Sequence, residues 1–467
     1  MKTTYFGEIG FQAWEILLLP ILFATIFVIA AQIKNRNIQT APYFRFLLPG
    51  MFAKVFGGIF FGCVYVYYYQ GGDTVSYYES SLAFSNLIQK SPYEGLEALF
   101  SPYSKEVRGL FDHTTGYPLS YIHSDISTFT VVRFVTPILM LSMESYLITT
   151  VLIACISFVG IWKAFALFQG YYPQLTRQLA IAFLFVPSVI FWGSGILKDT
   201  ITLSAACWFI VGIHGVFIVR RRVLMKIVSI LVASYLLIAI KPYIFMVLIP
   251  GTLIWVLFRW LQGLKSRFAR ILLIPFIYLA TAGLGVLLFS VLGNVLNEYS
   301  LQNIVDKAIV TQTDLKQDYY GQNSFDIGEL DPTFIGIVSK APIAILFGLF
   351  TPFLWNVNNI VMLFSALENS ILLVFVVWIL FRVGFVRIAR YIFKDPVLIF
   401  TLSFAVLFAL ALGLTTPNYG ALVRFKIPLI PFFVASLFIL QHLRERKLKK
   451  VPFVPRPANP VSEPPQA

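Results

Sequence analysis

The sequence predicts an all-α protein, a polytopic bundle of transmembrane helices, and two observations lead to that prediction. Hydrophobic residues make up 58% of the chain and charged residues only 12%, about half the charged share of a soluble domain. Many apolar runs reach the roughly 20 residues that a helix needs to cross the bilayer core, and lipid favours helices because they pair their own backbone groups. We expect one integral-membrane domain at 1–450, followed by a Pro-rich, disordered cytoplasmic tail at 451–467.

About eleven membrane spans are expected. They cover residues 13–33, 49–69, 146–168, 178–196, 200–219, 226–240, 243–260, 270–293, 359–381, 396–414 and 426–442. The first run lacks the basic leader of a signal peptide, so we expect it to be retained as a helix. The sixth and seventh should meet at Lys241 and Pro242, because proline disfavours a helical conformation in the residue before it.

The basic residues give the expected orientation. The formal net charge is +14, and most Lys and Arg residues lie in short loops between apolar runs, as at 220–222. This pattern marks the cytoplasmic side of a membrane protein, and it accounts for the positive charge without a nucleic-acid partner. The N-terminus is then outside and the C-terminus inside, and a bacterial inner membrane is the expected location.

Two large loops are expected on the outer face. The first, about 70–145, carries amphipathic segments that can lie along the membrane interface, and its short apolar run at 129–143 is expected to be interfacial or re-entrant. The second, about 294–358, is acidic and ends in an apolar run at 336–356. If that run crossed alone, Arg382 and its basic neighbours would lie outside, so a re-entrant or interfacial element is expected there too.

Five charged residues at the outer helix ends form the candidate site. The expected topology places Asp73, Lys198, Asp199, Lys241 and Arg424 at about one membrane depth. A basic residue at the outer face is unusual, because Lys and Arg favour the cytoplasmic side. It needs an anionic partner, which could be an acid, a lipid headgroup or a phosphate. Plain structural roles stay open, since Asp199 could cap a helix and Arg424 could anchor the interface.

These residue types suit the transfer of a sugar from a lipid-linked phosphate. A basic side chain beside the phosphate would stabilise the leaving group, and Asp73 could act as general base on an acceptor hydroxyl. Tyr77 and Tyr78 could stack on a sugar face, and Glu79 could bind substrate or simply hold the loop. The sequence shows no nucleotide-binding loop, which fits a donor carried by a lipid on the outer face.

Four stretches at the expected outer face carry the most specific pattern. They are Gly72-Asp73 with Tyr77 and Tyr78, FWGSGILKD at 191–199, LFTPFLW at 349–355 and RFKIPLIP at 424–431. Their order resembles that in integral-membrane glycosyltransferases of the GT-C class, including protein-mannosyltransferase-like and related bacterial families. The resemblance implies a polyprenyl-phosphate sugar donor, a catalytic Asp73, and Arg424 or Lys198 near the phosphate. Many of these enzymes carry two adjacent acids in the first loop, whereas Asp73 has no acidic neighbour before Glu79.

Two other functions stay open. A polysaccharide polymerase or ligase that joins lipid-linked repeat units would use the same basic residues at the outer face. A transporter or flippase of a lipid-linked anion would want charges near the midplane of several helices, whereas here they gather at helix ends. The acceptor could be a glycan, a lipid or a protein. No cofactor is expected, because no metal-ligand spacing is present, although a divalent ion at Asp73 stays possible.

Overall fold

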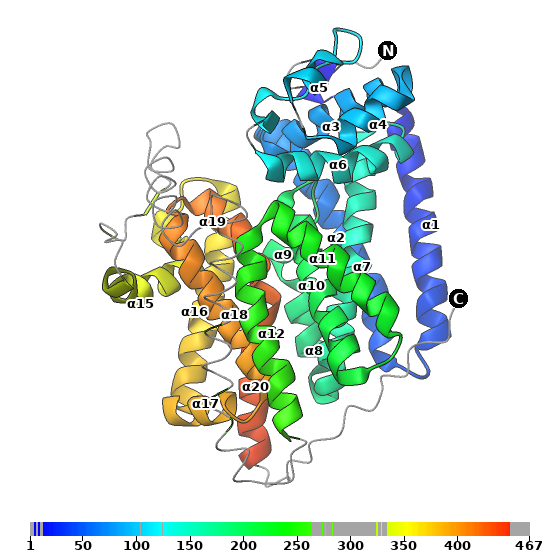
Figure 1. Ribbon diagram of the computed structural model, residues 1–467. Helices are drawn as coiled ribbons and strands as arrows, with labels where there is room; N and C mark the ends of the chain where they lie inside the picture. Colours follow the sequence, from blue (N-terminus) through cyan, green and yellow to red (C-terminus); the bar gives the residue numbers. More distant parts are fainter. Residues whose placement is uncertain are drawn as a thin grey trace.

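The computed structural model describes residues 13–262, except Tyr103 and Ser124, and residues 334–448. It also describes the single positions Thr4, Tyr5, Glu8, Ile9, Leu273, Phe276, Gly283, Ser324, Phe325 and Gly328. Nearly all of this chain is helical, and it forms a bundle of long helices with a layer of shorter ones over one end (Figure 1). Thr4–Tyr5 and Glu8–Ile9 pair as the two-residue strands β1 and β2.

Eight helices in the described part of the chain are long and apolar enough to cross a membrane, which confirms a mainly helical, integral-membrane protein. They are Trp14–Asn37, Pro42–Tyr68, Tyr146–Tyr171, Lys198–Val219, Val223–Ile240, Pro242–Leu261, Ile360–Val383 and Pro396–Thr415. A ninth arises if Tyr419–Phe425 and Ile430–Arg446 count as one span with a bend of 68°. The expected span at 270–293 lies outside the described residues, apart from three single positions.

These spans contain the following labelled elements. They are α1 (Ala13–Asn37), η1 (Pro42–Phe46), α2 (Leu47–Cys63), η2 (Val64–Tyr68), α7 (Tyr146–Tyr171), α10 (Lys198–Ile213), η6 (His214–Val219), α11 (Val223–Ile240), α12 (Pro242–Gln262), α16 (Ile360–Val383), α18 (Pro396–Thr415), α19 (Tyr419–Phe425) and α20 (Ile430–Leu448). As expected, α11 and α12 meet at Lys241, directly before Pro242. After Val383 the short amphipathic helix α17 (Phe385–Ile392) connects α16 to α18.

The single helix expected at 178–196 is wrong, because the structure divides this segment into short helical pieces. After η4 (Pro173–Leu175), these pieces are α8 (Thr176–Ala180), the π-helical η5 (Ile181–Phe185) and α9 (Pro187–Phe191). Val186 has an extended backbone, with φ −69° and ψ 125°, because the ring of Pro187 disfavours the α conformation in the residue before it. A turn after α9 then brings the chain directly to the start of α10.

The broken segment packs tightly against α2. A Cβ atom on Gly57 would lie 2.3 Å from the Ile190 carbonyl oxygen, so only glycine lets the two backbones approach this closely. Lys54 of α2 is also buried, and its Nζ donates a hydrogen bond to the carbonyl of Gly193 just beyond α9. This bond gives a basic side chain inside the bundle a polar contact.

The described residues of 70–145, where a large loop with amphipathic segments was expected, form a packed layer of short helices. The layer contains α3 (Asp73–Lys90), α4 (Pro92–Phe100), α5 (Lys105–Gly109), η3 (Ser120–His123) and α6 (Ile126–Leu141). It has a small core of its own, in which Phe84 and Leu87 of α3 pack with Phe129 and Val132 of α6. The layer lies at the end of the bundle where α7 begins (Figure 1).

The run expected to be re-entrant at 336–356 forms α15 (Phe334–Phe350) and η8 (Leu354–Asn356). The apolar helical part, Val338–Phe350, is shorter than a membrane span. It lies against α18 so closely that a Cβ atom on Gly413 would be 2.0 Å from the Ala344 carbonyl oxygen. Most of the preceding part of the expected second loop lies outside the described residues.

The two ends of the bundle carry different charges. The span Lys198–Val219 has 22 residues, so it separates its ends by about 33 Å at a rise of about 1.5 Å per residue. Its first end carries Lys198 and Asp199, and its second end leads into the basic turn at 220–222. The helix α20 runs away from Arg424 to a basic end at Arg444 and Arg446 in the same way. The candidate site therefore lies opposite the strongly basic end.

Candidate functional site

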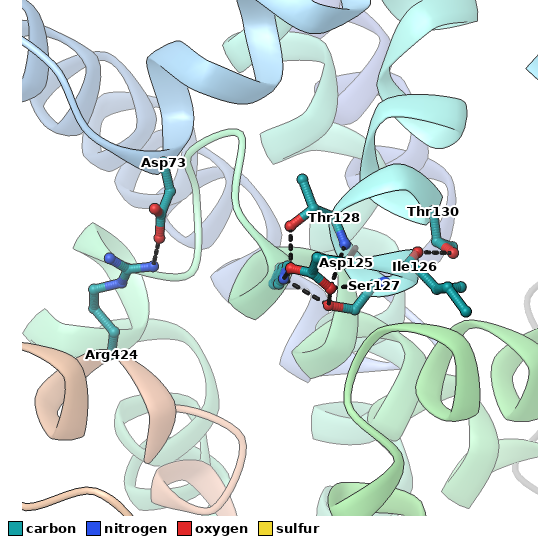
Figure 2. Close-up of polar contacts among 8 residues, drawn as sticks. Asp73, Asp125, Ile126, Ser127, Thr128, Thr130 and Arg424 are labelled. Carbon is teal, nitrogen blue, oxygen red and sulfur yellow. Dashed lines mark hydrogen bonds and ion pairs between the residues drawn. The ribbon is translucent and has the colours of Figure 1, made fainter. Parts of the chain in front are cut away.

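Asp73 is the first residue of α3, and the chain reaches it through a tight turn from η2. Gly72 has a φ of 103°, which favours glycine, and a Cβ atom there would lie 2.8 Å from the ring of Tyr65. At the start of the helix the Asp73 carboxylate accepts a hydrogen bond of 2.5 Å from Nη2 of Arg424 (Figure 2). This contact joins the short-helix layer to the C-terminal part of the bundle.

Arg424 reaches Asp73 because α19 and α20 are not one straight helix. Pro428 and Pro431 follow α19 in the sequence, and proline has no N–H to continue a helical hydrogen-bond ladder. The two helices differ in direction by 68°, which sets α19 across the end of the bundle. The side chain of Arg424 is 17% exposed, whereas that of Asp73 is 46% exposed.

Asp199 and Lys241 form a buried ion pair at the same end. Asp199 lies in the first turn of α10 and Lys241 in the turn between α11 and α12, and their side chains are 0% and 5% exposed. Nζ of Lys241 also lies 4.0 Å from the ring centroid of Phe425, the neighbour of Arg424. Nε of Arg424 lies 3.9 Å from Oδ2 of Asp199, so the two ion pairs form one network.

Lys198 turns away from this network toward α6. Its Nζ donates to Oδ2 of Asp125 at 2.8 Å and to Oγ of Ser127 at 2.6 Å. Asp125 caps α6, because its Oδ1 also accepts hydrogen bonds from the backbone N–H groups of Ser127 and Thr128 (Figure 2). Sequence reasoning did not single out Asp125, although an Asp three residues before Thr128 at the start of an apolar run is a typical N-cap signal.

All five charged residues that the sequence singled out thus gather at one end of the bundle, with Asp125 as a sixth. The described cluster holds three cations and three carboxylates, paired as Arg424–Asp73, Lys241–Asp199 and Lys198–Asp125. Burial raises the pKa of Asp73, but the charge and hydrogen bond of Arg424, together with the charges of Lys198 and Lys241, outweigh that effect and hold this pKa below its usual value. The carboxyl of Asp73 is therefore ionised at neutral pH, and the cluster carries no formal net charge.

Tyr77 and Tyr78 do not face an open site. They are 3% and 6% exposed, and the hydroxyl of Tyr78 donates to the backbone carbonyl of Glu144 at 2.8 Å. The expected stacking of a sugar on these rings has no open ring face to support it, because both rings pack in the core. Glu79 is half-buried on α3 six residues after Asp73, which places the two side chains on different faces of the helix.

Comparison with protein-family models, with curated proteins and with solved structures gives no match to this chain. Its function is therefore inferred from the geometry of its own residues. Among the described residues, no three His, Cys, Asp or Glu side chains gather closely enough to hold a metal ion.

A groove of about 440 Å³ begins one residue after the ion pairs, at Thr200 and Ile201 of α10. It lies between α6, α7, α10 and α11, and most of its lining is apolar. On its outer side the α11 residues Val228 and Val232 are 52% and 54% exposed, so the groove opens on the lipid-facing side of the bundle. Residues of the charged cluster and residues that line the groove thus follow one another in the first turn of α10.

Proposed function

We propose that this protein is a membrane glycosyltransferase, which moves a sugar from a polyprenyl-phosphate donor to a hydroxyl acceptor at the membrane surface. The observation that carries the proposal is the charged network in which Arg424 contacts both Asp73 and Asp199, beside Lys241. The chain brings these groups together from four separate elements at one bundle end. Such a set supplies a base and cations for a phosphate within one site.

In the proposed reaction, Asp73 accepts the proton of the acceptor hydroxyl while the hydroxyl oxygen attacks the anomeric carbon of the sugar. The bond between that carbon and the phosphate oxygen breaks, and the polyprenyl phosphate leaves with the electron pair. Arg424 and Lys241 stabilise the negative charge that grows on the phosphate. The apolar groove beside Thr200 offers a place for the lipid tail, which would let the phosphate reach the cluster from the bilayer.

The proposed site faces the outer side of a bacterial inner membrane. The opposite end of the bundle carries the basic turn at 220–222 and the basic end of α20, as cytoplasmic ends do. A donor made in the cytoplasm would then arrive as a lipid-linked sugar that has crossed the membrane. The acceptor can be a glycan, a lipid or a protein.

The test compares cells that carry the wild type, Asp73→Asn or Arg424→Ala at matched protein levels. Asp112→Asn serves as the control, because Asp112 pairs with Lys90 on the same layer but outside the cluster. We expect both site variants, but not the control, to lose a surface glycan and to accumulate a lipid-linked sugar.

The pattern of loss also separates the related functions. Loss of single sugars supports the transferase, whereas shortened chains would indicate a polymerase that joins lipid-linked units. The proposal would be contradicted if both site variants left the glycans and the lipid intermediates unchanged, since the cluster would then be structural. Transport of a lipid-linked anion would become the better hypothesis.

A further inference from the structure

We infer that the Asp73–Arg424 ion pair is a gate that the donor must open before the base can work. This inference rests on the proposed function. In the structure the carboxylate that would take the acceptor proton is bound to the guanidinium that would bind the phosphate. Both groups cannot keep this bond and also serve substrate. The donor phosphate therefore replaces Asp73 on Arg424, and the freed carboxylate turns to the acceptor hydroxyl.

The exposures of the three linked side chains identify Asp73 as the group that moves. Asp199 is 0% exposed and bound to Lys241, and Arg424 is 17% exposed, whereas Asp73 is 46% exposed. A charge that leaves a partner must be rehydrated or paired again, and only the exposed carboxylate has water beside it. Asp73 can thus leave the pair at the lowest cost.

The backbone before Asp73 allows this movement. Gly71 and Gly72 both have positive φ values, 155° and 103°, and they connect η2 to the first turn of α3. Among the described residues, nothing lies within 4 Å of a Cβ atom built on Gly71, so the turn is open on that side. Glycine explores more backbone conformations than any other residue, which makes this pair a suitable hinge for a small shift of Asp73.

Arg424 stays in place when Asp73 leaves. Its Nε and Oδ2 of Asp199 are buried and have no hydrogen-bond partner among the described residues, and they lie 3.9 Å apart. A shift of about 1 Å would close this distance to an ordinary hydrogen bond. Arginine has five N–H donors, so Arg424 can hold Asp199 through Nε and still offer its other donors to a phosphate.

The charge balance also indicates that the donor binds before the acceptor is activated. The described cluster is neutral in its resting arrangement, with three ion pairs. A sugar phosphodiester adds one negative charge. This charge repels the carboxylates of the cluster, and Asp73, the most exposed of them, is the one displaced from its cation. When Asp73 takes the acceptor proton it becomes neutral, just as the departing lipid phosphate gains its second negative charge. Donor binding therefore precedes acceptor activation.

The test measures the binding of a short-chain polyprenyl monophosphate to the purified full-length protein in nanodiscs. In the wild type Asp73 competes with the phosphate for Arg424, so removing its charge should tighten binding. We expect Asp73→Asn to bind the probe about tenfold more tightly than the wild type, which corresponds to about 1.4 kcal/mol. Asp112→Asn should bind like the wild type, and Arg424→Ala should bind at least about tenfold more weakly.

The possible failures are distinguishable. Equal affinities of the wild type and Asp73→Asn would overturn the gate but leave a phosphate site and the proposed function in place. If neither protein binds the probe, that result contradicts the proposed function and the gate together.

A second measurement does not depend on a variant. Hydrogen exchange of the wild type should become faster in the peptide that covers 70–78 when the probe is added, because Asp73 no longer ties the first turn of α3 to α19. Slower exchange there would mean that the probe locks the pair, and it would contradict the gate.

Discussion

At the scale of single residues, burial decides how much each ion pair contributes to stability. Asp112 and Lys90 are both more than a third exposed, and pairs of this kind contribute little to the free energy of unfolding. Asp199 and Lys241 are almost completely buried, so each charge depends on the other for a partner. Replacing one of the two side chains leaves an uncompensated charge in the bundle. Replacing both with apolar residues need not lower the free energy of unfolding.

This asymmetry gives a prediction for Asp199 and Lys241. Asp199→Leu or Lys241→Met alone should lower the free energy of unfolding by about 3–5 kcal/mol, because the remaining charge is buried without its partner. The double variant should recover most of that loss, although Arg424 keeps only Asp73 as its acidic partner. Chemical denaturation in detergent micelles measures all three, and a double variant no more stable than the less stable single variant would contradict the prediction.

At the scale of elements, Lys426 fixes the break between α19 and α20. It is 1% exposed, and its Nζ donates to the carbonyls of Leu349 and Thr351 at 3.1 and 3.0 Å and to Oδ1 of Asn369 at 2.6 Å. The first two acceptors lie at the C-terminal end of α15, which needs such donors because its last carbonyls have no helical partner. One lysine therefore connects the end of α15, the side of α16 and the break that positions Arg424.

Replacing Lys426 should consequently lower the stability of the protein and loosen the end of α15. Lys426→Met leaves three buried acceptors without this donor, and at about 1–3 kcal/mol for each unpaired group we expect a loss of at least about 3 kcal/mol. We also expect faster proteolysis around 349–356, because the end of α15 is no longer held. Lys394→Met, at an exposed position between α17 and α18, is the matched control. Equal unfolding curves for the two variants would show that Lys426 does not pin these elements.

At the scale of the whole molecule, the charged ends predict how the bundle sits in the membrane. Cysteines placed at Asp112, in the layer, and at Arg221, in the basic turn, report on the two ends after the three natural cysteines have been replaced. A membrane-impermeant maleimide added to intact cells should label position 112 and not position 221. The reverse pattern would put the cluster in the cytoplasm and would contradict a donor that arrives on the outer face.

Most of the spans that the structure describes could be predicted closely, because length and apolarity are properties of the local sequence. The expected helix at 396–414 matches Pro396–Thr415, and the turn at Lys241 was placed correctly by its proline. The gathering of Asp73 and Arg424 could also be predicted, since both lie at helix ends on one side of the expected membrane.

Other features could not be predicted, because they depend on distances between elements that are remote in the sequence. The partner of Lys198 is Asp125, 73 positions away, and its choice follows from how α6 packs against α7 and α11. The burial of Tyr77 and Tyr78 likewise depends on the packing of α3 on its neighbours. The break at Val186 was missed because the apolar run continues through Pro187, and apolarity alone does not distinguish one helix from two pieces.

The bond between Lys54 and Gly193 also bears on how the chain is made. Lys54 lies inside the second span, but its acceptor is 139 positions later, so at roughly 5–20 residues per second it is synthesised roughly 7–30 seconds afterwards. During that interval a lysine near the centre of a newly inserted helix carries an insertion cost of about 3 kcal/mol. The arrival of the broken segment relieves this cost, which favours its docking on α2 before the C-terminal helices, and with them Arg424, have been made.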